Sequence, residues 1–138
     1  MVLKRSLARG LRNDRGQSVV EFALVLPLLL LIVFGITEFS RAWMTMNVLT
    51  AAAREGCRLG VVTGPDVPAV VARVNEVCTA ARVTPTNVTV TGPDPTDPER
   101  RLTVTVQADF QVIPGDILGT FSGTIPLRAS AVMRHESI

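Results

Sequence analysis

The sequence predicts an α+β fold with a long N-terminal helix, transmembrane in its first half, a second short helix, and a three-stranded antiparallel sheet packed on the helices. Three observations predict it. An apolar run occupies residues 19–37. Apolar residues then recur at helical spacing over 39–57 and 67–81. After Pro85 the apolar period changes to two, the period of a strand with one buried face.

The charge is uneven along the 138 residues, a length that leaves room for one ordinary domain. Residues 1–16 carry five basic side chains against Asp14, a net charge of +4, whereas the remainder carries −2. The basic excess lies beside the apolar run, and the body carries no basic stripe. This distribution argues against a nucleic-acid partner.

The apolar run is the main topological feature. Val19 to Thr37 is 19 residues with one charge, Glu21, against the roughly 20 needed to span a bilayer. The basic flank predicts an N-terminus in the cytoplasm and the remainder outside. A secretory signal peptide is the alternative, but its apolar core is usually shorter and a small-residue cleavage site follows. Here residues 37–41 read TEFSR, which favours a retained anchor.

The helical pattern continues beyond the span. One stripe with spacings of 4, 3, 4, 3 and 4 consists of Phe39, Trp43, Met46, Thr50, Ala53 and Cys57. On the polar side, Glu38 with Arg41 and Glu55 with Arg58 have the spacing of i,i+3 ion pairs. These features predict one helix over about 18–59, kinked at Pro27 and stopped at Gly60.

A second helix follows a turn at residues 63–66, with Asp66 as the candidate N-cap and Pro68 in the first helical turn. Its predicted apolar stripe consists of Val67, Val71, Val74, Cys78 and Ala81. Cys57 and Cys78 each lie in the apolar stripe of their own helix, so facing helices would make them a candidate disulfide in an exported domain. The alternative is two buried thiols that act as small apolar residues.

Alternation predicts the sheet. Val88 and Val90 alternate with threonines in the first strand. In the second, the apolar positions are Leu102, Val104, Val106, Ala108, Phe110 and Val112, and in the third Ile125, Leu127, Ala129, Ala131 and Met133. Proline-rich residues 92–98 and residues 113–123 are the predicted connectors. A sheet with one apolar face needs a cover, which the two helices supply.

Enzyme chemistry is not indicated. The one histidine, His135, lies near the C-terminus, and the two cysteines lack the spacing of a zinc site. The glycines match no nucleotide-binding or phosphate-binding loop, and no serine lies in a recognisable catalytic motif. We therefore expect no catalytic residue, metal, cofactor or small-molecule substrate.

Glu21 is the unusual residue, because a carboxylate in hydrocarbon is costly and is usually retained for a function. Gly16, followed by Gln17 and by Glu21-Phe22 at the start of the apolar run, resembles the processing site of type IV pilin-like proteins. Residues 23–30 (ALVLPLLL) and 51–58 (AAAREGCR) resemble the TadE-like family more specifically, as does the closing stretch 129–134. That family comprises pseudopilins, or minor pilins, of the tight-adherence (Tad) pilus, which is type IVb-like.

The resemblance implies a pilin-like fold and three segments: a leader peptide at 1–16, a transmembrane part at 17–38, and an extracytoplasmic domain at 39–138. A prepilin peptidase would cut between Gly16 and Gln17, and the new amine of Gln17 would pair with Glu21 of a neighbouring pilin. The implied partners are that peptidase, other Tad pilins and pseudopilins, the inner-membrane assembly platform and the lipid bilayer.

The implied location is the bacterial inner membrane as a single-pass protein, in association with a pilus that mediates surface adherence. The alternative from another class is an unprocessed, membrane-anchored extracytoplasmic scaffold or binding domain. The two differ in whether the mature chain begins at Gln17. The resemblance does not distinguish TadE from its TadF-like sibling.

Overall fold

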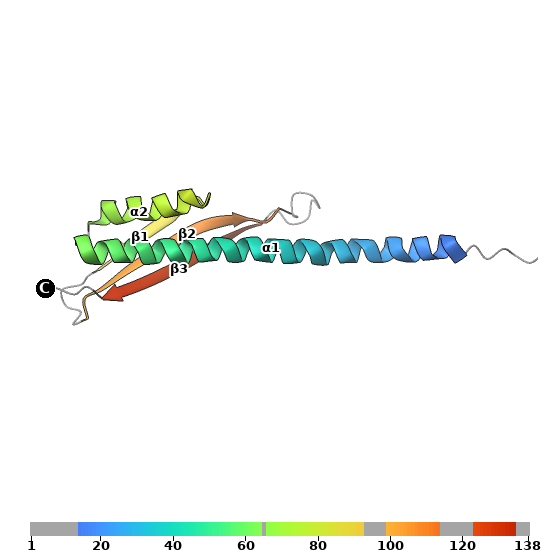
Figure 1. Cartoon of the computed structure of the whole chain (residues 1–138), viewed down its shortest axis with the longest axis horizontal. Helices are drawn as coiled ribbons and strands as arrows, with labels where there is room; N and C mark the ends of the chain where they lie inside the picture. The colour runs from blue at the N-terminus through green and yellow to red at the C-terminus, as the bar shows by residue number, and fades with distance from the viewer. Residues whose placement is uncertain (1–13, 65, 93–98, 114–122, 135–138) are drawn as a thin grey trace, which may run out of the picture. The chain divides into compact units, whose positions relative to one another are not determined.

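A computed structural model of the chain describes residues 14–64, 66–92, 99–113 and 123–134. The predicted α+β class, with two helices and a three-stranded antiparallel sheet, is confirmed. The predicted connectors lie mostly outside the described residues, as do nearly all of the predicted leader and His135. The elements in chain order are α1 (Asp14–Thr63), α2 (Val67–Ala80), β1 (Asn87–Thr91), β2 (Arg101–Gln111) and β3 (Thr124–Arg134) (Figure 1).

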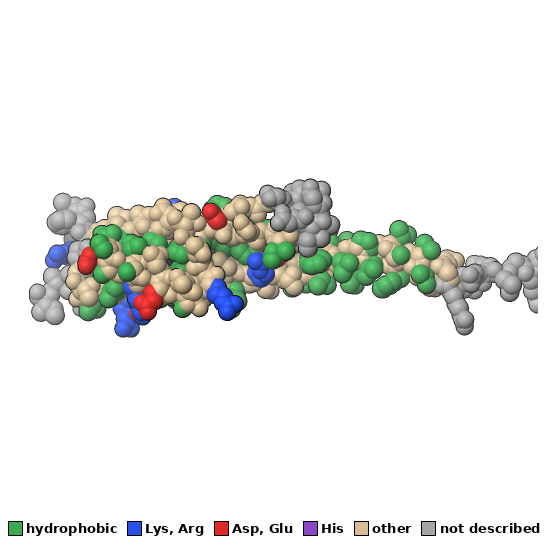
Figure 2. Space-filling view, turned by 90° about the horizontal axis from the view of Figure 1, so that it is seen from above, with side chains coloured by type: hydrophobic (Ala, Val, Ile, Leu, Met, Phe, Trp, Pro, Cys, Tyr) green, Lys and Arg blue, Asp and Glu red, His purple; other side chains and the backbone are tan. Residues whose placement is uncertain are grey.

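The chain divides into two compact units, Met1–Ile36 and Thr37–Ile138. In the first unit α1 is the described element, and it continues through Pro27 although proline removes one backbone donor. Side chains from Gln17 to Ile36 are exposed, and Figure 2 shows hydrophobic ones along one face of this segment. Within Gly16–Thr63 an 18-residue window reaches a mean hydropathy of 2.8, so this helix is long and apolar enough to cross a membrane.

The second unit contains the sheet, whose strand order is β1-β2-β3 with antiparallel pairs throughout. Val106 of β2 lies opposite Val88 on one side and Ala129 on the other, so apolar residues of all three strands share one face. On the opposite face, Thr105 Oγ1 lies 3.2 Å from Ser130 Oγ, and this bond satisfies the hydroxyl of a nearly buried threonine. The alternation predicted for the second and third strands is therefore confirmed.

Both helices pack on the apolar face and form one hydrophobic core with it. The fully buried residues are Leu49, Ala52, Ala53 and Cys57 of α1, Val70, Val74 and Cys78 of α2, and Leu102, Val104 and Val106 of β2. Small residues on α1 allow the helix to approach the sheet and α2 closely. Most of the stability of this unit is expected to come from the burial of these side chains.

The boundary between the helices differs from the prediction. Gly60 does not stop α1, which ends at Thr63, and Gly64 follows with φ +88°. A left-handed glycine directly after the last helical residue is a common helix end. Asp66 occupies the predicted N-cap position of α2, but its side chain makes no capping hydrogen bond.

The end of α2 is a Schellman motif. The N–H of Arg82 bonds the carbonyl of Thr79 at 2.9 Å, and the N–H of Val83 bonds that of Cys78 at 2.9 Å. Arg82 has φ 58°, a left-handed conformation that glycine usually supplies.

The predicted apolar stripe of α1 is only partly buried. Ala53 and Cys57 lie in the core and Met46 packs against it, but Phe39 and Trp43 are 69% and 61% exposed. The α2 stripe is also shifted, because Val70 is buried whereas Val67 is exposed. Sequence spacing identifies an apolar face, but the extent of the partner surface decides which of its residues are covered.

Candidate functional site

The predicted processing residues lie in the first turns of α1. Gln17 and Glu21 are one helical turn apart, and the Gln17 side-chain amide donates a hydrogen bond to Glu21 Oε1 at 3.1 Å. Both side chains are exposed. The structure thus places on one helix face the residue expected to carry a new amino group and the carboxylate expected to receive one.

Glu21 has unused acceptor capacity. A carboxylate can accept about four hydrogen bonds, and the described residues supply the one from Gln17. No ion pair joins Glu21 to a described cation. In an apolar helix such a group can be stabilised by a cation from outside its own chain.

In the second unit, α1 and α2 are held together by close packing at two glycines. A Cβ built on Gly56 would lie 2.6 Å from Val74 Cγ2 of α2. One on Gly60 would lie 3.1 Å from Val70 Cγ2 of α2 and 2.5 Å from Leu102 Cδ2 of β2. The two glycines form a G-x-x-x-G spacing, which can bring helices close in proteins. The prediction of Gly60 as a helix stop missed this role.

An ion-pair group links the helices at their surface. Arg73 of α2 contacts Glu55 of α1 at 2.9 Å and Glu76 of its own helix at 2.9 Å. The pKa of Arg73 is raised above its ordinary value. The hydrogen bond with Glu55 contributes most to this rise, and the hydrogen bond with Glu76 contributes next. The predicted Glu38–Arg41 pair is present, but Glu55 pairs with Arg73 rather than with Arg58. These groups are substantially exposed, so salt should weaken their attraction.

Cys57 and Cys78 are both buried free thiols in the structure, so the predicted disulfide is not confirmed. The Cys57 thiol faces the sheet, where it donates to the Ala131 carbonyl at 3.2 Å and approaches the Leu102 carbonyl at 3.7 Å. It is Gly56, not Cys57, that faces Val74 of α2. Burial raises the pKa of both thiols, and for Cys57 a backbone hydrogen bond from Val104 partly opposes this.

The arrangement offers no catalytic chemistry in the described part of the chain. No group of three or more histidine, cysteine, aspartate or glutamate residues there could hold a metal ion. An open hollow of about 240 Å³ is lined by Arg41, Thr45, Arg82, Asp109 and neighbouring residues. It contains no nucleophile paired with a base.

These features define a class: a chain with one candidate membrane span, followed by an α+β unit of two helix segments on a three-stranded sheet. Residues 16–58 match the family described as TadE-like protein. The resemblance seen in the sequence is thus confirmed over a segment that begins at Gly16 and includes Gln17, Glu21 and Cys57, and residues 129–134 lie outside the matched segment. No curated protein and no solved structure matches the chain.

The TadE-like match suggests a minor-pilin-like protein associated with a Tad pilus. The family is a structural, pilin-like one and is not known for enzymatic activity. Membrane anchoring through the N-terminal apolar helix is consistent with this class.

Proposed function

We propose that this chain is a TadE-like minor pilin of a Tad pilus, processed between Gly16 and Gln17 by a prepilin peptidase. The observation that carries the proposal is the position of the family match. It begins at Gly16 and covers the helix that contains Gln17, Glu21 and the candidate span. In this proposal the same segment serves as a processing site, an anchor and a contact surface between pilins.

The charge pattern supports an N-terminus on the cytoplasmic side. The five basic residues before Gln17 precede the apolar run, and such residues are retained in the cytoplasm. Residues after the span, and with them the α+β unit, would then lie outside the membrane. Cleavage would remove the basic leader and leave the apolar helix as the start of the mature chain.

Cleavage would also change the charge next to Glu21. The new α-amino group of Gln17 has an ordinary pKa of about 7.7–8.0 and would be largely protonated at neutral pH. Within one helix, Gln17 already contacts Glu21 through its side-chain amide. The ammonium of one chain and the Glu21 carboxylate of its neighbour would form a charge-assisted hydrogen bond, which fixes the axial offset between adjacent helices.

In this function the protein would contact other Tad pilins and pseudopilins, the peptidase and the inner-membrane assembly platform. It would act in the assembly of a pilus used in surface adherence. The exposed apolar helix would exchange contacts with lipid for contacts with neighbouring helices on assembly. Small and apolar side chains along this helix suit both surroundings.

The deciding experiment is intact-mass analysis of the protein from its native host, with the prepilin peptidase present. We expect a mature chain that begins at Gln17. A matched strain without the peptidase should yield the full-length chain. A full-length chain in both strains would contradict processing and would favour an unprocessed, membrane-anchored scaffold.

A further inference from the structure

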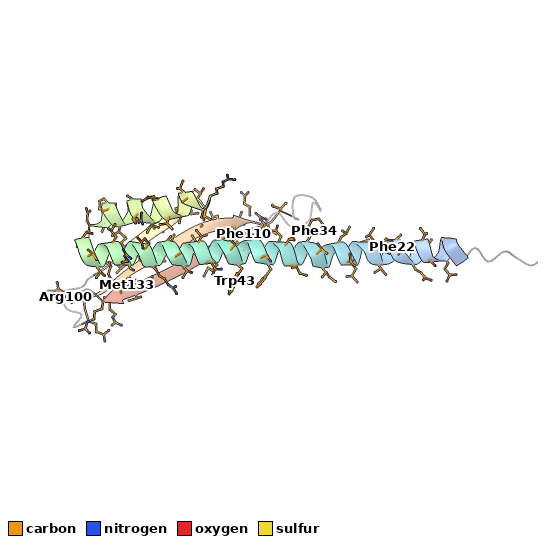
Figure 3. The ribbon with its side chains drawn as sticks, in the orientation of Figure 1. Phe22, Phe34, Trp43, Arg100, Phe110 and Met133 are labelled. Carbon is orange, nitrogen blue, oxygen red and sulfur yellow. The ribbon has the colours of Figure 1, made fainter. Side chains whose placement is uncertain are left out.

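Phe39 and Trp43 form an exposed aromatic pair on α1. Their ring centroids are 6.3 Å apart with an interplanar angle of 22°, and both side chains are more than 60% exposed. In Figure 3, Trp43 and Phe110 of β2 lie on opposite sides of α1. The pair therefore continues the apolar stripe of the helix beyond the part that the sheet covers.

Other exposed apolar residues of the second unit lie at the same end. Arg41, between the two aromatics in sequence, lies with Cζ 5.1 Å from the Phe110 ring centroid. Phe110 pairs across the sheet with Ile125, which is 49% exposed. Ile113 follows two residues after the end of β2 and is 51% exposed, and Met44 is 71% exposed. Phe110 lies on the opposite side of α1 from Trp43 and is itself only 7% exposed, so the Phe39–Trp43 pair forms an exposed aromatic patch of its own.

We infer that the Phe39–Trp43 pair of α1 lies in the headgroup region of the outer membrane-water boundary, at the edge of the hydrocarbon. The inference rests on the proposed membrane anchoring. Val19 to Thr37 would extend about 28 Å as a helix, close to the roughly 30 Å of a bilayer core. Phe39 and Trp43 follow two and six residues later, which is about 3–9 Å beyond that edge.

The chemistry of the Phe39–Trp43 pair fits a headgroup region better than water or a second protein surface. Tryptophan is enriched at membrane-water boundaries because its ring is apolar and its N–H is polar. Arg41 lies between the two aromatics in sequence and is 45% exposed, so headgroups and water can solvate its charge, whereas its ion-pair partner Glu38 is only 15% exposed.

Trp43 is the single tryptophan of the chain, which has no tyrosine, so tryptophan emission reports this position alone. The experiment uses the full chain in phosphatidylcholine-phosphatidylglycerol vesicles whose acyl chains carry bromine either near the headgroup or near the terminal methyl. We expect stronger quenching by the shallow bromines than by the deep ones, and a blue-shifted emission relative to the unfolded chain.

The matched control moves the probe by one helical turn. The double variant Trp43→Phe, Asn47→Trp places the tryptophan at an exposed position farther from the span, and we expect weaker quenching by both lipids. Vesicle flotation is measured on the same samples. A chain that does not float with the vesicles would contradict membrane anchoring and with it this inference.

If the chain floats with the vesicles but neither brominated lipid quenches Trp43 emission, the inference is overturned and membrane anchoring still stands. If Trp43 in that case became shielded from aqueous iodide as the protein concentration rose, the Phe39–Trp43 pair would be a contact between copies of the chain instead.

Discussion

The Cβ position of Gly56 lies 2.6 Å from Val74 Cγ2, a separation that side chains do not tolerate, so α1 and α2 can pack this closely only with glycine at this site. Gly56→Ala should lower the free energy of unfolding of the α+β unit. Overpacking costs about 1–3 kcal/mol, and the better helix propensity of alanine offsets about 1 kcal/mol of it. Chemical unfolding followed by circular dichroism in detergent measures the difference.

Two further variants sharpen this test. Gly123→Ala adds a methyl group where no atom lies within 4 Å, so it should change stability little. Val74→Ala on the Gly56→Ala background should recover part of the loss by making room for the new methyl group. Equal effects of Gly56→Ala and Gly123→Ala would contradict close packing at Gly56.

Arg82 should be a site where glycine stabilises the protein. Its φ of 58° at the Schellman end of α2 is unfavourable for a residue with a Cβ. We expect Arg82→Gly to raise the free energy of unfolding by about 1 kcal/mol, and Arg82→Ala to do so by much less. Thermal unfolding of the wild type, Arg82→Gly and Arg82→Ala would measure these differences. If alanine stabilised the protein as much as glycine, the loss of the arginine charge would be the cause instead.

The buried thiols predict a loss of stability at alkaline pH. Burial raises the pKa of Cys57 and Cys78 in the folded state, so the unfolded chain loses these protons first as the pH rises. The stabilisation is fully present below the ordinary thiol pKa of 9.0 and is lost as the pH rises above it toward the folded pKa values. The free energy of unfolding of the reduced protein, measured from neutral to alkaline pH, should fall in this window.

The composition of the chain leaves few other groups that titrate in the alkaline range of this measurement. The chain has no tyrosine, and Lys4 is its one lysine, so few other groups titrate there. The variant Cys57→Ala, Cys78→Ala should flatten the profile. A reduced wild-type protein with a flat profile would contradict burial of the thiols. If oxidation flattened the pH profile of the free energy of unfolding and also shifted the gel mobility of the wild type, these results would show that the predicted disulfide can form.

Glu21→Gln should separate processing from assembly. Glutamine keeps the shape and a hydrogen-bond acceptor but removes the charge that an ammonium would pair with. We expect mature chains that begin at Gln17 in normal amount, together with fewer pili or weaker pilin-to-pilin crosslinking. Undiminished assembly would remove Glu21 from the mechanism.

Gln17→Ala is the matched control for that experiment. It removes the side-chain amide that contacts Glu21 but leaves the α-amino group that cleavage would create. Assembly should survive Gln17→Ala, provided that the N-terminus is still processed. A loss of assembly in both variants would instead indicate that the amide contact itself is required.

The sequence predicted the strands well because their period depends on local alternation. The apolar positions from Leu102 to Phe110 alternate in sequence and all are buried in β2, where Thr105 is the one polar residue between them that is also buried. The extent of helix burial was harder to predict. Phe39 and Ala53 lie on the same predicted stripe, yet only Ala53 is buried, because the surface that covers α1 is built by residues far along the chain.

Partner choice across helices was also beyond local reasoning. Glu55 has Arg58 at i,i+3, but Arg73 of α2 takes the contact once the helices pack. Gly60 has the sequence appearance of a helix end, and its close approach to Leu102 appears only when the sheet is in place. The G-x-x-x-G spacing at Gly56 and Gly60 was the one local signal available for this packing.

The meander order of the sheet makes its folding a succession of local events. Each strand pairs with a strand next to it in the chain, a topology of short sequence separations that favours fast folding. β3 pairs with β2 along its whole length and supplies the Ala131 carbonyl that receives the Cys57 thiol. In a chain delivered across a membrane from α1 onward, β2 would therefore reach Cys57 before β3, and the arrival of β3 would complete the enclosure of the thiol and the core.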